Sequence, residues 1–178
     1  MQTITVCTDA GYKRLHKQTI AGWATYIRTP SQTIHASGII GQRTKGSSQA
    51  ELYAIANALH VLNRNYDLSK YKVILYSDSL YALRNHLDGS LGKQRQDRKE
   101  VYDKFIRPQL DKIMVYEARH VKGHLPKSEW ASSSARFYMQ NWCDEEVHRI
   151  MKIMYAIVNK KAEEKRLCLQ QKKSIIKP

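Results

Sequence analysis

Acidic residues are scarce in this chain of 178 residues, which has 16 Asp and Glu against 30 Lys and Arg and a formal net charge of +14. That imbalance favours a polyanionic partner, with nucleic acid the first candidate and an anionic membrane surface the second. Long apolar runs are also missing, since no stretch approaches the roughly 20 residues that a membrane-spanning helix needs. The first residues, MQTITVCTDAGYK, lack the basic-then-apolar order of a signal peptide. We therefore expect a soluble, intracellular, cytoplasmic protein.

Cysteine is scarce as well. Cys7, Cys143 and Cys168 are odd in number and widely spaced, which argues against a disulfide framework and against a zinc site. This usage favours a reducing compartment. The length and the 42% hydrophobic content predict one globular domain with a real core, together with an appendage.

Five segments have the pattern of β-strands. Three β-rich stretches, 3–8, 22–28 and 33–40, are joined by short polar connections, of which GYKRLHKQT is expected to be a loop or turn. Short connections predict an antiparallel meander. The nearly continuous apolar run at 72–77 predicts a strand buried on both faces, and 114–120 predicts a fifth strand.

Helical patterns lie between and after these strands. Apolar residues at helical spacing predict a helix over 48–62, and shorter helical patterns follow at 79–87 and 97–113, with Pro108 kinking or splitting the last. The stretch 122–140 reads as irregular, and an amphipathic helix is predicted over 142–158. The fold class is therefore α/β, a five-stranded mixed sheet flanked by helices, with a domain at 1–158 and a basic C-terminal extension at 159–178.

Two carboxylates are expected where strands end. Asp9 follows the first strand and Asp78 follows the fourth, so if these strands are parallel neighbours both carboxylates lie at the edge where α/β sheets bind ligands. Read alone, Asp9 is more simply a turn residue whose side chain caps its own backbone.

Two further carboxylates are expected at helix starts. Glu51 borders the core-facing stripe of the first helix, although Ser48-x-x-Glu51 also fits a capping box. Asp144 is expected to begin the last helix one turn before Val147, although acidic residues favour helix N-termini in any case. Four carboxylates in one place repel each other unless cations lie among them. Two Mg²⁺ or Mn²⁺ ions, which prefer hard oxygen ligands, are the expected cofactors.

Five short motifs occur in an order that resembles ribonuclease H of type I over residues 3–157: TDAG, AEL, YSDS, VKGH and WCDEE. The resemblance implies a ribonuclease H-like fold and an endonuclease that hydrolyses the RNA strand of RNA–DNA hybrids by a two-metal-ion mechanism, leaving 3′-hydroxyl and 5′-phosphate ends. By this likeness Asp9, Glu51, Asp78 and Asp144 are the metal-binding catalytic carboxylates. His124 matches the loop histidine that assists proton movement or product release, although a loop histidine is more often a plain surface residue.

The residues expected to contact the hybrid depart in part from the family pattern. The family's glycine-rich turn after the first Asp is replaced, so Lys13 and Arg14 are expected to meet phosphates instead. In place of the family's Asn pairs stand Ser47, Ser48 and Gln49, which can hydrogen-bond 2′-hydroxyls. A short basic protrusion, or alternatively a solvated helix face, is formed by Lys93, Arg95, Arg98 and Lys99. The basic extension is either a helix that adds hybrid affinity or a partly frayed end.

Two other functions stay open on the sequence alone. One is a hybrid-binding module that has the fold without catalysis, and the other is a DNA nuclease of the integrase or resolvase type on the same fold. We expect a monomer with no membrane role and no small-molecule cofactor.

Overall fold

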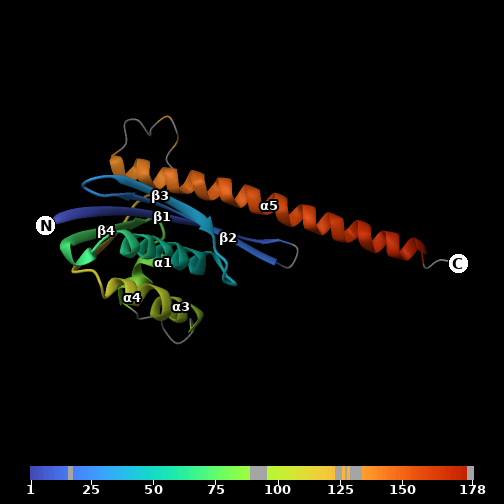
Figure 1. Ribbon diagram of the computed structural model, residues 1–178, viewed down its shortest axis with the longest axis horizontal. Helices are drawn as coiled ribbons and strands as arrows, with labels where there is room; N and C mark the ends of the chain where they lie inside the picture. Colours follow the sequence, from blue (N-terminus) through green and yellow to red (C-terminus); the bar gives the residue numbers. More distant parts are fainter. Residues whose placement is uncertain (16–17, 89–95, 123–125, 127, 129–133, 176–178) are drawn as a thin grey trace.

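The computed structural model describes residues 1–15, 18–88, 96–122, 126, 128 and 134–175, and of these the side chains of 85–88 and 170–175 are not described. Five strands form one mixed sheet in the order β3-β2-β1-β4-β5, and helices cover both of its faces (Figure 1). The strands are β1 (Gln2–Leu15), β2 (Gln18–Arg28), β3 (Thr33–Ile39), β4 (Tyr71–Ser77) and β5 (Val115–His120). Pairing is antiparallel between β1, β2 and β3 and parallel between β1, β4 and β5. The predicted fold class is confirmed.

Strand β1 is much longer than predicted. The segment GYKRL, expected to be a loop, continues the strand to Leu15, and it pairs with β2 down to Leu15 opposite Gln18. Beyond Cys7, the last residue of β1 that pairs with β4, strand β1 continues to pair with β2. Past Gly11, where the pairing of β2 with β3 has ended, the two strands form a two-stranded ribbon. Polar side chains suit this ribbon because pairing with β2 already satisfies the backbone groups.

One layer of helices covers the first face of the sheet. It contains α1 (Ser47–Asn65), α3 (Gln96–Val101) and α4 (Arg107–Leu110), with a short helix α2 (Leu80–Asp88) after β4 and a 3-10 turn η1 (Leu68–Lys70) before it. Ten buried side chains of α1, among them Leu52, Ile55, Leu59 and Leu62, supply much of the core, as their spacing predicted. The turn η2 (Tyr102–Ile106) is π-helical and directly precedes α4, whose Pro108 lacks the N–H that a regular helix would use.

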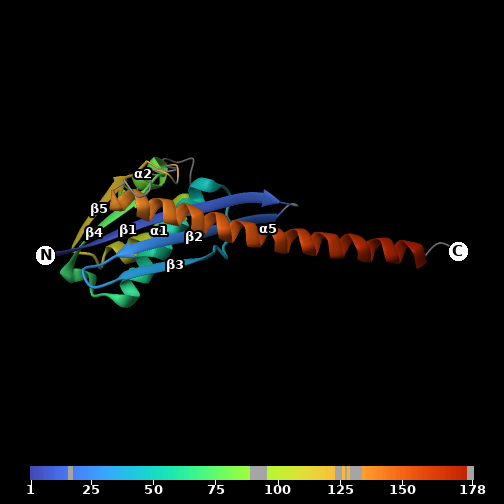
Figure 2. The same cartoon turned by 90° about the horizontal axis from the view of Figure 1, so that it is seen from above.

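The second face is covered by one long helix, α5 (Ala135–Ile175). It begins in the stretch expected to be irregular, and it continues through the basic extension as an arm that leaves the sheet behind (Figures 1 and 2). The prediction that the helix starts near Trp142 is therefore wrong. Within the described part of the chain, no helix combines the length and apolarity required to cross a bilayer.

Two glycines allow α5 to pack closely against the sheet. Gly11 of β1 and Gly22 of β2 lie directly opposite each other in the antiparallel pair. A Cβ on Gly11 would lie 2.6 Å from Met151 Cγ and 2.8 Å from Val147 Cγ1, and one on Gly22 would lie 2.9 Å from Ile150 Cγ2. The helix can approach the ribbon this closely because neither glycine has a side chain.

Candidate active site

Asp9 and Asp78 lie at the same edge of the sheet, as predicted from their places after apolar runs. Asp9 comes two residues after the last parallel pair between β1 and β4, and Asp78 directly follows β4. Asp9 does not end its strand, however, because β1 continues along β2, and the turn interpretation of Asp9 is therefore wrong. Asp9 is 7% exposed, so its carboxylate is held inside the edge of the sheet.

The backbone around Asp78 is held by several hydrogen bonds. The Ser79 hydroxyl accepts from the Ala82 N–H at 3.2 Å and so caps the start of α2. The Ser79 N–H donates to Ser77 Oγ at 3.1 Å, and His120 Nε2 lies 3.1 Å from the Asp78 carbonyl oxygen. These contacts fix the turn in which Asp78 lies between β4 and α2.

Glu51 reaches the same place from α1. The helix begins at Ser47 with Gly46 as N-cap and no side-chain cap bond, so the predicted capping box between Ser48 and Glu51 is absent. Glu51 instead turns inward, and its Oε2 atom is shielded from solvent with no hydrogen-bond partner among the described residues. A buried carboxylate oxygen without a partner is costly unless a ligand satisfies it.

Three of the four predicted carboxylates meet. Asp9, Glu51 and Asp78 each offer an oxygen atom, and these atoms all lie within 4.8 Å of one another. Asp144 lies close enough for its charge to act on Asp9, but its carboxylate is not part of this closest group. The helix containing Asp144 begins nine residues earlier, at Ala135, so the explanation of Asp144 as a helix N-terminal residue is wrong.

Burial and the charges of neighbouring acids raise the pKa of Asp9 and Glu51. Burial raises the pKa of Asp9 to about 8, and the charges of Asp78 and Asp144 add to that shift while the Ala10 backbone N–H opposes it. Burial likewise raises the pKa of Glu51, with further contributions from Asp9 and Asp78. Without a metal ion, Asp9 and Glu51 therefore keep their protons at pH values at which an ordinary carboxyl group is ionised.

This set of donors fits divalent cations. All of its ligating atoms are carboxylate oxygens, the ligands that Mg²⁺ and Mn²⁺ prefer, and Glu51 has a buried oxygen without a hydrogen-bond partner in the described part of the chain. A cation among the carboxylates would relieve the repulsion that, after burial, adds to the raised pKa of Asp9 and Glu51.

Side chains of α5 that the sequence did not single out fix this helix against β1. Gln140, which is 1% exposed, donates from Nε2 to the Thr8 carbonyl at 3.2 Å. Cys143 Sγ donates to the Cys7 carbonyl at 3.4 Å. Thr8 directly precedes Asp9, Cys7 lies one residue further back, and Cys143 directly precedes Asp144, so both bonds set how close the two acids come. No sequence signal marks Gln140, because its segment was read as irregular.

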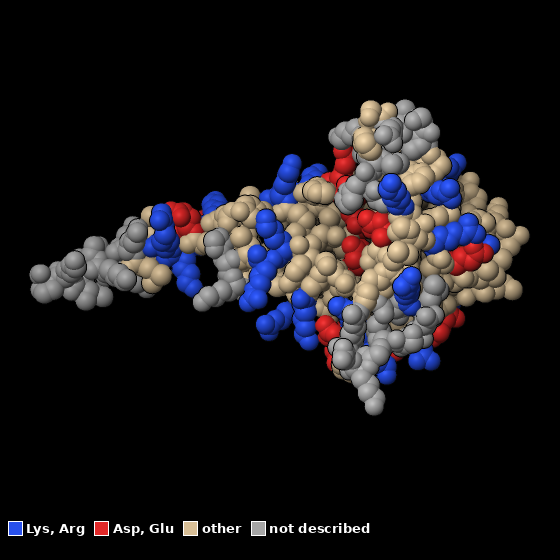
Figure 3. Space-filling model, turned by 180° about the vertical axis from the view of Figure 1, so that it is seen from behind, with Lys and Arg blue, Asp and Glu red and all other residues tan. Residues whose placement is uncertain are grey.

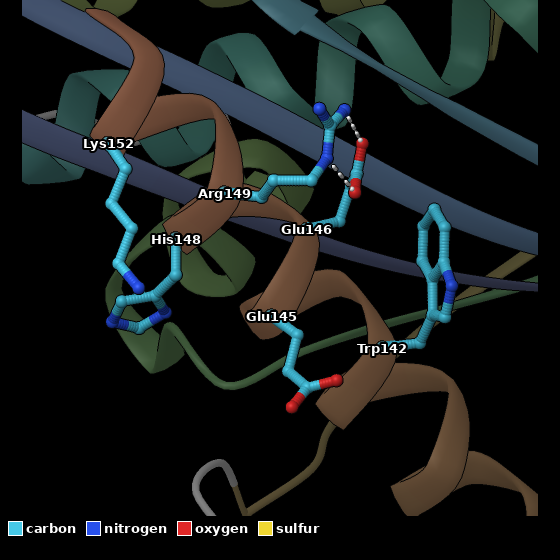
Figure 4. Close-up of a pocket in the computed structure, with 6 residues that line it drawn as sticks. All are labelled: Trp142, Glu145, Glu146, His148, Arg149 and Lys152. Carbon is cyan, nitrogen blue, oxygen red and sulfur yellow. Dashed lines mark hydrogen bonds and ion pairs between the residues drawn. The ribbon is translucent and has the colours of Figure 1, made fainter. Parts of the chain in front are cut away.

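His148 is a second residue that sequence reasoning missed. Its Nδ1 atom lies 3.2 Å from Asp144 Oδ1 and 2.9 Å from the Asp144 carbonyl oxygen. The four-residue spacing on a helix was the available signal. His148 also borders an open hollow of about 590 Å³ along α5, in which Arg149 bends back to bond Glu146 (Figure 4). The hollow is lined by Trp142, Glu145, Glu146, His148, Arg149 and Lys152.

The residues expected to contact a hybrid differ in how exposed they are to solvent. Lys13, Arg14, Ser47 and Lys99 are exposed and Ser48 is half-buried. Gln49 is buried, with its oxygen accepting from the Lys45 N–H at 2.7 Å and its amide donating to the Asp97 carbonyl at 3.2 Å. Gln49 therefore links the loop before α1 to the start of α3. A contact of its buried side chain with the hybrid does not fit this structure.

The basic protrusion is described in part. Arg98 bonds the Tyr81 hydroxyl and lies 4.4 Å over the Tyr81 ring. His124, Lys93 and Arg95 lie outside the described residues.

Comparison with known proteins identifies the family. The model of the RNase H family matches residues 1–136, more than half of the chain, although the match ends before Asp144. A search of the curated proteins found no match.

Solved structures share the fold at low identity. LC11-RNase H1 in complex with an RNA/DNA hybrid is 22% identical, with a TM-score of 0.62 over 85% of this chain and 99% of that one. RNase H1 from the archaeon Halobacterium salinarum NRC-1 is 15% identical, with a TM-score of 0.61 over 84% and 98%. The RNase H domain of PFV is 17% identical, with a TM-score of 0.60 over 86% and 96%. The sheet order, the carboxylates at its edge and the family match agree, and the chain belongs to the RNase H family and is a ribonuclease H enzyme.

Proposed function

We propose that this ribonuclease H cuts the RNA strand of RNA–DNA hybrids as an endonuclease, with two divalent ions, Mg²⁺ first among them, and leaves 3′-hydroxyl and 5′-phosphate ends. The observation that carries the proposal is the meeting of Asp9, Glu51 and Asp78 within 4.8 Å, from β1, α1 and the turn after β4. A buried oxygen of Glu51 has no hydrogen-bond partner among the residues that the structure describes. Asp144 completes the proposed set from α5.

The four carboxylates would hold the ions, and the chemistry divides between them and the rest of the chain. When bound, two such ions would stabilise charge on the attacking and leaving oxygens of a phosphodiester. The protein's part is to hold Asp9 and Glu51 rigidly in a poorly hydrated edge, where electrostatic interactions are stronger than in water. For His124 we propose the movement of a proton at the leaving oxygen or the release of product.

Basic side chains near this edge support hybrid binding. A polar hollow of about 350 Å³ is lined by Tyr12, Arg14, Gln18, Thr19, Arg43, Thr44 and Lys45. Lys and Arg side chains also stand on both sides of the acidic residues on the face shown in Figure 3. Contacts of this kind with phosphates give affinity that falls steeply with salt and depends little on sequence. Nothing in this arrangement needs a second copy, and we infer a monomer.

Asp9→Asn tests the assignment. Labelled hybrid, duplex RNA and duplex DNA are incubated with Mg²⁺ and the parent protein, Asp9→Asn or Asp103→Asn, an exposed residue of η2 that gives the same charge change. We expect cleavage of RNA in the hybrid alone, a loss of at least about 1000-fold in Asp9→Asn, and no loss in Asp103→Asn. Primer extension from the products checks for 3′-hydroxyl ends.

Other results would change the conclusion. Equal cleavage by Asp9→Asn refutes the site. Binding of the hybrid without cleavage favours a binding module, and cleavage of duplex DNA favours the integrase or resolvase class.

A further inference from the structure

The arm of α5 and the β1–β2 ribbon meet at a second, basic surface beyond the carboxylates. A hollow of about 260 Å³ between them is lined by Lys13 and Ile20 of the ribbon and by His148, Met151, Lys152 and Tyr155 of the helix. Lys13 Nζ lies 4.9 Å from the centre of the Tyr155 ring, so an aromatic ring and an ammonium group lie together at this junction. Lys13 and Lys152 are both exposed.

This hollow continues directly from the active site. Asp144, His148 and Lys152 lie on successive turns of α5, each about 40° further round the helix. His148 contacts Asp144 on one side and borders the hollow on the other. In Figure 4 the side chains of His148 and Lys152 project to the same side of the helix. A strand bound at the carboxylates therefore has a route along this face of α5.

The charge of the arm fits one kind of partner. From Val147 to the end, the sequence has nine Lys and Arg and two acidic residues, Glu163 and Glu164, a difference of 9 − 2 = +7. Lys160, Lys161, Lys165 and Arg166 are exposed, although Arg166 bonds Glu163 at 2.7 Å. Lys and Arg also gather on the face in Figure 3 where the arm leaves the domain. The arm also exposes apolar side chains such as Ile153, Ile157 and Leu167, but its net positive charge favours a regular array of phosphates over a purely apolar partner.

We propose that the junction of the ribbon and α5, with the arm beyond it, is a second binding surface that grips the phosphate backbone of the hybrid at a distance from the cut. This rests on the proposed function, because it takes the same hybrid as its ligand. From Lys152 to Ile175 the helix rises about 35 Å, which matches roughly 10 base pairs at 3.4 Å each. The surface therefore favours long hybrids over short ones.

The test compares hybrids of two lengths with charge-matched variants. Lys13→Gln/Lys152→Gln removes two charges at the junction, and Arg64→Gln/Lys112→Gln removes two exposed charges from the helical layer on the other face of the sheet. Affinity for hybrids of about 8 and about 24 base pairs is measured by fluorescence anisotropy in EDTA over a range of salt. Metal-free binding keeps this readout separate from cleavage.

For the long hybrid, we expect the junction variant to bind roughly tenfold more weakly, with a salt slope smaller by about 1 to 2, because each lost phosphate contact lowers the slope by about 0.9. The control variant should differ little from the parent. The short hybrid, about 27 Å long, should lose less affinity than the long one because it reaches the junction only with one end. An unchanged salt slope of the junction variant on the long hybrid would overturn the proposal. A dimer in sedimentation, with hybrid affinity unaffected by the junction variant, would also overturn it, because the arm would then join two copies of the chain. If the parent protein shows this length-dependent binding but cleaves no hybrid, the proposed function is refuted and the second binding surface is still supported.

Discussion

At the scale of single residues, the buried acids make the metal-free protein sensitive to pH. The ordinary pKa of Asp is 3.8, and in the folded protein the pKa of Asp9 is raised to about 8, with Glu51 raised as well. Between these values the folded state keeps protons that the unfolded state has released. Stability is then highest at low pH within this window and falls as the pH rises from about 4 towards 8, by up to roughly 1.4 kcal/mol per pH unit for each such group.

Urea unfolding in EDTA at pH 5 and pH 8 measures this effect. We expect a lower free energy of unfolding at pH 8, a smaller difference in Asp9→Asn, and recovery at pH 8 when millimolar Mg²⁺ is added, because an ion that binds the folded state stabilises it. Equal stability of the metal-free parent at both pH values would contradict the burial of these acids.

At the scale of elements, the site depends on how closely α5 lies on the ribbon. Gly22→Ala would place a Cβ 2.9 Å from Ile150 Cγ2, so the helix or the strand has to move. We expect a loss of about 1–3 kcal/mol in the free energy of unfolding, the usual range for overpacking, and a lower cleavage rate because Asp144 moves with α5. Urea unfolding and single-turnover cleavage measure the two effects.

Gly41→Ala is the matched control, because a Cβ on Gly41 meets nothing within 4 Å. If Gly22→Ala were as stable and as active as Gly41→Ala, the close packing of α5 against Gly22 would not matter for the site.

The elements also show what the sequence can and cannot predict. Asp9 and Asp78 were found because each follows an apolar run whose pattern is local, and parallel pairing of β1 with β4 then brings them together. The ribbon beyond Asp9 was missed because its polar residues owe their strand structure to partners on β2. The start of α5 was missed because buried polar residues such as Gln140 break the apolar pattern, and their hydrogen bonds to β1 exist only in the folded protein.

At the scale of the whole molecule, we propose that residues 1–158 form the catalytic domain and that the extension from 159 onward is energetically separate from it. The ribbon ends near Tyr155, and Lys160, Lys161 and Leu167 of the arm are exposed. A single helix without tertiary packing is marginal in water, since most helical stability in proteins comes from a buried face. The arm should therefore exchange its amide hydrogens much faster than the domain does.

Deleting residues 162–178 tests this separation. We expect the melting temperature to change by no more than about 2 °C, since few buried contacts are lost, and the cleavage rate at saturating hybrid to stay within about twofold of the parent. A matched chain with the same deletion and Ile150→Ala should have a clearly lower melting temperature. Its free energy of unfolding should fall by about 2–5 kcal/mol, because Ile150 is 6% exposed and packs on Gly22. A large loss of melting temperature from the deletion alone would mean that the arm folds as part of the domain, and the boundary near residue 158 would then be wrong.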